Sequence, residues 1–171
     1  MKNLNLYFDI AATTPMDLTV AEVVHKANIE SFGNPSSMHM PGQKSHNIVE
    51  RSRTSIAEIL NCKTSEIIFT SGGSESNNIV LKGVLKKGDH LITSSYEHPS
   101  VLNLAKYLEK NGIEVSFVKP KNNGSISVED IKSKIKENTK LISIMYVNNE
   151  LGTINPIKEI GDIAYENKVL F

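Results

Sequence analysis

The sequence has few of the features that mark several classes of protein. It contains one cysteine, Cys62, and so no internal disulfide, which fits a reducing compartment. Nineteen basic residues balance nineteen acidic ones, so no net charge attracts nucleic acid or an anionic membrane. Its apolar runs are too short to span a bilayer, and no signal-peptide core follows Met1. We therefore expect a soluble, cytoplasmic protein with no direct nucleic-acid or membrane partner.

What is present is typical of a folded domain. The chain has 171 residues, of which 39% are apolar and 22% charged. Short β-branched runs alternate with longer stretches of helical spacing, the pattern of βαβ units. We expect an α/β fold: a mostly parallel sheet with helices on both faces.

The same patterns place the individual elements. Helices are expected near residues 48–60, 79–85, 99–110, 128–136 and 156–166. Strands are expected at residues 66–70, 90–93, 115–118 and 141–147. Residues 168–171 resemble the start of a further buried strand, so we expect an incomplete domain, cut off at a core strand.

Ser71–Asn77 joins a predicted apolar strand to a predicted helix and contains Gly72 and Gly73. Glycine lets the backbone approach a ligand, and the free N–H groups at a helix N-terminus bind anions. This pattern predicts a phosphate-binding cup, to which Ser74 could add a hydroxyl. It matches neither the Walker A loop nor the dinucleotide-binding fingerprint. The alternative is a serine-capped helix after a tight turn.

His98 lies in the next loop, just before the helix that Pro99 begins. Loops that follow parallel strands meet at one edge of the sheet, so we expect His98 near the cup. An imidazole can stack on a heteroaromatic ring and exchange protons near neutral pH. The simpler alternative is a histidine that caps the helix.

Asn149 follows the apolar strand predicted at residues 141–147 and lies in the stretch Asn148–Gly152. A side-chain amide at this edge can donate to a phenolate-like oxygen. The alternative is a plain turn, because Asn and Gly are common turn residues. Each signal is weak alone, but a cup, an imidazole and an amide donor at one edge predict a cofactor site.

Five motifs follow one another along the chain: Tyr7–Asp9 with Ala11–Pro15, Phe32–Ser37, Phe69–Gly72 with Glu75–Asn78, Glu97–His98, and Val147–Gly152. In this order they resemble the class V aminotransferase-like cysteine desulfurases, the group that supplies sulfur for iron–sulfur clusters and tRNA thiolation. The resemblance covers nearly the whole chain.

The resemblance implies a homodimeric enzyme that uses pyridoxal 5'-phosphate to convert L-cysteine to L-alanine, leaving a persulfide for a scaffold protein or a tRNA-thiolation acceptor. Gly73 and Ser74 would hold the cofactor phosphate. His98 would stack on the ring and move protons as the catalytic residue, and Asn149 would bond the ring oxygen. Relatives often have Ala-Thr in the cup, and the Gly-Ser of this chain keeps the same donors.

It further implies the large domain of the aspartate-aminotransferase-like fold type I. We expect an N-terminal segment at residues 1–15 and the first part of the cofactor-binding domain at residues 16–171. The family's ring-nitrogen aspartate, Schiff-base lysine and nucleophilic cysteine would lie beyond Phe171, so we expect an inactive fragment. Cys62 precedes the first predicted core strand and is expected to be structural.

Two other hypotheses stay open. One is another class V enzyme, such as a selenocysteine lyase or a kynureninase. The other is a truncated, non-catalytic product that acts as a dimerisation or scaffold-binding module. No metal site is expected, because metal-ligand spacing is absent around the remaining histidines, His25, His39, His46 and His90.

Overall fold

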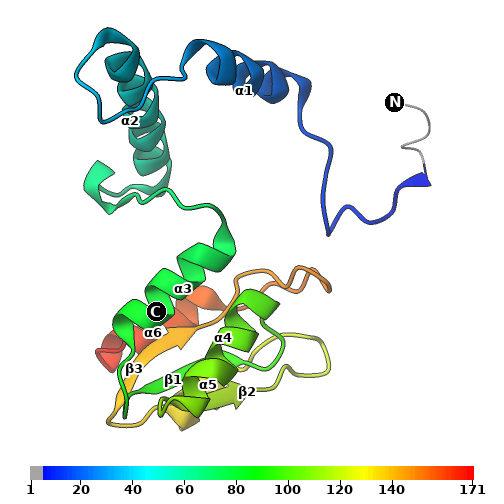
Figure 1. Cartoon of the computed structure of the whole chain (residues 1–171). Coiled ribbons are helices and arrows are strands. Elements are labelled where there is room, and N and C mark those ends of the chain that lie inside the picture. Colours follow the sequence, from blue (N-terminus) through cyan, green and yellow to red (C-terminus); the bar gives the residue numbers. More distant parts are fainter. Residues whose placement is uncertain (1–5) are drawn as a thin grey trace. The chain divides into compact units, whose positions relative to one another are not determined.

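The computed structural model describes residues 6–171 and divides the chain into two compact units, one ending at Phe69 and one running from Thr70 to Phe171 (Figure 1). Residues 1–5, part of the predicted N-terminal segment, lie outside the described residues. The boundary expected at residue 15 stays a prediction. Among the helices described, none has the length and apolar character that crossing a membrane requires.

Among the described residues, the first unit includes the helices α1 (Leu18–Glu30) and α2 (Met40–Leu60) and the short 3₁₀ helix η2 (Thr64–Glu66). The side chain of Asp17 caps the N-terminus of α1. α2 ends where the sequence predicts, because Asn61 takes the left-handed backbone (φ 52°) of a C-terminal cap. It begins earlier than predicted, because the Nδ1 atom of His39 accepts a hydrogen bond from the Gly42 amide (3.2 Å).

The Phe32–Ser37 motif forms a turn against the first turn of α2. A Cβ on Gly33 would lie 2.3 Å from the carbonyl oxygen of Pro41. A Cβ on Gly42 would lie 2.4 Å from that of Ser37. The two glycines therefore let the turn and the helix approach backbone to backbone.

The strand predicted at residues 66–70 is wrong. η2 covers its first residue, and Ile67–Thr70 pairs with no strand in the described part of the chain. Aromatic and β-branched residues favour strands, but a strand also needs a neighbour that bonds its backbone groups. Here the Arg53 guanidinium bonds the Ile67 carbonyl and lies 4.9 Å from the centroid of the Phe69 ring.

The second unit contains a parallel sheet of three strands in the order β2-β1-β3. The strands are β1 (His90–Ser94), β2 (Glu114–Val118) and β3 (Thr139–Ser143). The helices are α3 (Gly73–Val84), α4 (Pro99–Lys110), α5 (Val128–Lys134) and α6 (Ile157–Glu166).

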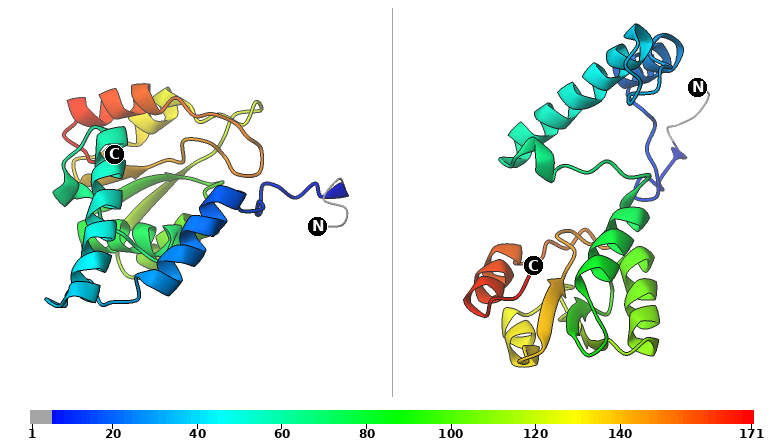
Figure 2. Two further views of the ribbon diagram at one scale, coloured as in Figure 1. Left: turned by 90° about the horizontal axis from the view of Figure 1, so that it is seen from above. Right: turned by 60° about the vertical axis from the view of Figure 1, so that its left-hand side comes forward.

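Successive residues of β1 and β3 point to opposite faces of the sheet and build two separate cores. Leu91 and Leu141 pack with side chains from α3 and α4. Ile92 and Ile142 pack with side chains from α5 and α6. Helices therefore cover both faces, as Figure 2 shows. The predicted α/β fold class is confirmed.

The helices predicted at residues 99–110 and 156–166 are confirmed as α4 and α6, and the one at 128–136 ends two residues early. β3 ends at Ser143, so its predicted extent to residue 147 is wrong. Beyond β3, side chains form the hydrogen bonds to the backbone that a neighbouring strand would otherwise form. The Met145 amide donates to Glu97 (3.0 Å), and the Met145 carbonyl accepts from Asn155 (2.8 Å).

Residues 168–171, predicted to begin a further strand, pair with β3 through a single parallel bridge between Leu170 and Leu141. The Leu170 amide donates to Lys140 (3.1 Å), and its carbonyl accepts from the Ile142 amide (2.8 Å). Leu170 therefore pairs with this edge of the sheet, but Leu170 and Phe171 are exposed, and the expectation of a core strand cut off here stays a prediction.

Candidate functional site

The candidate site lies where β1 and β3 end side by side. The two strands are parallel neighbours, and the chain leaves them for helices on opposite faces of the sheet, α4 after β1 and α6 after β3. In α/β proteins ligands bind at such a divergence, next to the carboxyl ends of the strands. α3 joins this edge through Asn77, whose Nδ2 atom lies 2.8 Å from the Oγ of Ser100 in the first turn of α4.

The predicted phosphate cup is the N-terminus of α3. Gly72 is the N-cap and no side chain caps the helix, so the serine-capped alternative is wrong. Within residues 6–171, no protein group accepts a hydrogen bond from the amides of Gly73 and Ser74. Both residues are exposed, and apart from the adjoining residues and the nearby backbone of α3 no described atom lies within 4 Å of a Cβ built on Gly73. The amides are therefore available to an anion.

Glu75 fixes the loop in front of the cup. One oxygen of its carboxylate accepts hydrogen bonds from the amide (2.6 Å) and the hydroxyl (2.7 Å) of Ser71. These bonds, that of the amide first, hold the pKa of Glu75 below its ordinary value. The hydroxyls of Thr70 and Ser76 lie 2.8 Å apart across the same turn. The turn that contains the two glycines is therefore stabilised by hydrogen bonds between the residues before it and the first turn of α3.

His98 is the N-cap of α4, because its Nδ1 accepts a hydrogen bond from the Ser100 amide (3.1 Å). The capping alternative for this histidine is confirmed. The residue is nevertheless exposed, so the imidazole can also meet a ligand. The Oγ of Ser100 lies 2.8 Å from the same Nδ1. Through Ser100 and Asn77, His98 is connected to the helix that begins with the cup.

Asn149 lies in the turn of a small hairpin beyond β3, where Val147 and Ile154 form an antiparallel bridge. The turn alternative is confirmed. The side chain of Asn149 is exposed, and its amide donates to the carboxylate of Glu150 (3.0 Å). The cofactor contacts expected of Asn149, His98 and the cup stay predictions.

Asn148, for which the sequence predicted no role of its own, shapes this turn. Its side chain is buried, and its Oδ1 accepts from the amides of Glu150 (3.0 Å) and Leu151 (2.8 Å). Its Nδ2 donates to the carbonyl of Tyr96 (3.2 Å), in the loop that carries His98. Asn148 therefore fixes the turn and also ties it to the neighbouring loop.

Glu97 makes a second link between the same loops and was also missed. Its side chain is only 6% exposed, and its Oε1 accepts from the Ser94 hydroxyl (2.6 Å) and the Met145 amide (3.0 Å). Burial raises the pKa of Glu97 above its ordinary value, while the two hydrogen bonds act in the opposite direction. The carboxyl holds the two loops together.

Asn155 is the third buried polar residue that the sequence analysis missed. Its Oδ1 accepts from the Tyr96 hydroxyl (3.0 Å) and the Ile126 amide (2.9 Å), and its Nδ2 donates to Met145 (2.8 Å). One sequence feature could have pointed to two of these residues. Glu97 directly precedes His98, and Asn148 directly precedes Asn149. A polar loop residue is usually exposed, and nothing local marked these as buried.

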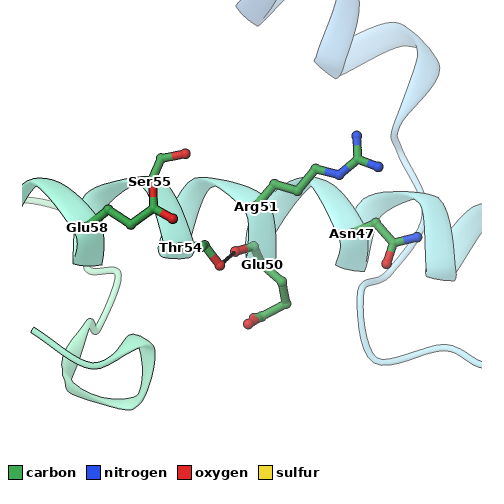
Figure 3. A pocket seen from close by; sticks show the side chains of 6 residues that line it. All are labelled: Asn47, Glu50, Arg51, Thr54, Ser55 and Glu58. Atoms are coloured by element: carbon green, nitrogen blue, oxygen red, sulfur yellow. Dashed lines mark hydrogen bonds between the residues drawn. The ribbon is translucent and has the colours of Figure 1, made fainter.

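A separate hollow of about 550 Å³ lies along α2 in the first unit (Figure 3). It is lined by Asn47, Glu50, Arg51, Thr54, Ser55 and Glu58. All six come from one helix, so a ligand would be held from one side only. The edge of the sheet, where several elements converge, is the better candidate.

The chain is similar to known proteins in both sequence and structure. The family described as Aminotransferase class-V matches residues 6–171. The cysteine desulfurase IscS 1 of Archaeoglobus fulgidus is 47% identical over 92% of this chain and 42% of its own length. A solved NifS-like protein superposes with a TM-score of 0.91 at 37% identity, over 96% of this chain and 47% of that one. SspA in complex with cysteine gives 0.89 at 43% identity, over 95% of this chain and 48% of that one. The chain thus spans less than half the length of the relatives it matches.

Proposed function

The chain belongs to the aminotransferase class-V family, and we propose that it forms the cofactor-binding part of a cysteine desulfurase that uses pyridoxal 5'-phosphate. One observation carries the proposal: the uncapped N-terminus of α3 is connected by hydrogen bonds to the exposed His98. The turn that carries Asn149 is tied to the same loop by Glu97 and Asn148.

The residues present fit the parts of this cofactor. Its phosphate needs an anion site, which the amides of Gly73 and Ser74 and the Ser74 hydroxyl would provide. Its aromatic ring needs a flat partner, and the exposed imidazole of His98 would stack on it. Its ring oxygen needs a donor, which the side-chain amide of Asn149 would supply.

When bound, pyridoxal 5'-phosphate would supply the electron sink for bond changes at the substrate's α-carbon. His98 would hold and move a proton through its ring nitrogen, as an imidazole does in general acid–base catalysis. Asn149 would orient the ring through one hydrogen bond. Because Glu97 and Asn148 lock the two loops together, these side chains would need little reordering when a ligand arrives.

We infer that the substrate is L-cysteine, and that the products are L-alanine and a persulfide whose sulfur serves iron–sulfur clusters or tRNA thiolation. Relatives named cysteine desulfurase and the solved complex of SspA with cysteine support this choice. A homodimer in the cytoplasm belongs to the same proposal. The cofactor lysine and the nucleophilic cysteine are assigned to no residue of this chain.

The test is L-alanine formation by the protein that contains residues 1–171, supplied with pyridoxal 5'-phosphate and L-cysteine. With a thiol reductant such as dithiothreitol present to reduce the persulfide, we expect alanine and sulfide to appear together and both to be lost when the cofactor is left out. Turnover of selenocysteine or kynurenine in place of cysteine would assign another activity. Cofactor binding with no turnover of cysteine would contradict the proposed substrate.

A further inference from the structure

The hydroxyl of Ser100 joins two elements of the candidate site. Its Oγ lies 2.8 Å from Nδ1 of His98 and 2.8 Å from Nδ2 of Asn77, on α3. The Ser100 amide donates to the same Nδ1 (3.1 Å). The hydrogen bonds to the His98 ring within residues 6–171 are therefore all made at Nδ1.

The chemistry of these groups sets the direction of each hydrogen bond. An amide nitrogen is a donor only, so Ser100 Oγ accepts from Asn77 and keeps its own proton for His98. Nδ1 then receives two donors, the hydroxyl and the amide of Ser100. A ring nitrogen that accepts carries no proton, and in a neutral imidazole the proton then lies on Nε2.

We propose that Asn77 and Ser100 are positioning residues that hold neutral His98 as the Nε2–H tautomer. Nε2 is then the nitrogen through which the ring donates to a ligand, while Nδ1 accepts hydrogen bonds from Ser100, in the first turn of α4. The inference deepens the proposed function and rests on it for the identity of the ligand. The tautomer itself is a property of this chain. One helix, α3, thus provides the cup and, through Asn77, also contributes to the protonation of the histidine.

Nitrogen-15 NMR of ring-labelled histidine tests this directly, at an alkaline pH where imidazoles are neutral. The His98 signals are assigned by their loss in His98→Gln. We expect a pyridine-like Nδ1 and a pyrrole-like Nε2. Asn77→Asp replaces the donor by an acceptor of the same shape, which attracts the Ser100 hydroxyl proton away from Nδ1.

In Asn77→Asp we expect the ratio of Nε2–H to Nδ1–H to fall about tenfold, the effect of roughly one net hydrogen bond. Ser100→Ala should lower the ratio less, because the backbone amide stays, and Ser100→Thr should restore it. Asn103→Asp is the matched control, since it makes the same charge change at an exposed position of α4. It should leave the ratio unchanged.

A wild-type Nδ1 that carries the proton would overturn the proposal. So would a ratio that moves in neither Asn77→Asp nor Ser100→Ala. If Asn77→Asp fails to fold by circular dichroism, Ser100→Ala with its threonine rescue decides the question. An absorbance titration with pyridoxal 5'-phosphate tests the proposed function separately from the tautomer. Failure to bind the cofactor counts against the proposed function, whereas the NMR measurement of the tautomer needs no cofactor.

Discussion

The buried carboxylate of Glu97, just beyond β1, accepts a hydrogen bond of 3.0 Å from the backbone amide of Met145, just beyond β3. The first of these residues precedes His98, and the second begins the loop that carries Asn149. The two loops of the candidate site are therefore joined inside the protein and not through a ligand. A preformed site of this kind binds without the cost of ordering its loops.

Replacing Glu97 by alanine should destabilise the protein by about 2–4 kcal/mol, because the Met145 amide loses its acceptor and a cavity replaces the side chain. Glu97→Gln keeps a carbonyl oxygen for both hydrogen bonds and should cost less. Urea unfolding followed by circular dichroism measures both. The control is Glu109→Ala, at an exposed position of α4, which should change stability by less than about 0.5 kcal/mol. Equal effects of Glu97→Ala and Glu109→Ala would contradict the role given to the buried carboxyl.

His90 should make stability depend on pH. Its ring is fully buried, with Nδ1 2.8 Å from the Thr139 hydroxyl and Nε2 2.9 Å from that of Ser116, so it joins all three strands. Burial and the nearby charge of Lys136 lower its pKa. Glu114 acts in the opposite direction, and Lys134 adds to the lowering.

The direction of this pH dependence follows from the number of protons that the folded and unfolded states bind. In the unfolded chain a histidine binds a proton near pH 6.5, whereas folded His90 stays neutral to a lower pH. The unfolded state therefore binds more protons in that window, and the free energy of unfolding falls as the pH drops below about 6.5. This residue accounts for a slope of at most about 1.4 kcal/mol per pH unit.

Urea unfolding at a series of pH values from 7.5 downward checks this. His90→Gln should be less stable at neutral pH and should lose the part of the slope that His90 contributes. The control is His25→Gln, at an exposed position of α1, which should keep the wild-type slope. An unchanged slope in His90→Gln would assign the pH dependence to other groups.

In the complete enzyme, His98→Ala should lower turnover of cysteine more than Asn149→Ala. General acid–base groups contribute about 10²–10⁴-fold, whereas one net hydrogen bond contributes about 0.5–1.5 kcal/mol. Steady-state kinetics at matched cofactor occupancy measure the two losses. Equal or reversed losses would count against these assignments.

Periodicity was sufficient to predict the α/β class, because the alternation at Leu91 and Ile92 is a local property of the chain. The caps at Pro99 and Asn61 gave helix ends for the same reason. The strand expected at residues 66–70 failed because strand formation depends on a partner that local sequence does not reveal.

The site was predicted in part. Gly73, Ser74, His98 and Asn149 stand out by residue type and by their place after a predicted strand, although the strand predicted before Gly73 is not formed. Glu97, Asn148 and Asn155 do not, because their roles depend on burial and on partners up to 59 residues away, as in the bond between Tyr96 and Asn155. Such contacts exist only in the folded chain.

The proposed function depends on one contact: the N-terminus of α3 would hold the phosphate of pyridoxal 5'-phosphate. The most direct measurement compares the dissociation constants of pyridoxal 5'-phosphate and of pyridoxal, which lacks the phosphate, in the wild type, in Ser74→Ala and in the control Ser133→Ala on α5. We expect about 10- to 100-fold tighter binding of the phosphorylated compound, the effect of one or two hydrogen bonds to a charged group. Ser74→Ala should reduce this preference and Ser133→Ala should not. Equal affinity of the wild type for the two compounds would show that the N-terminus of α3 does not hold the phosphate.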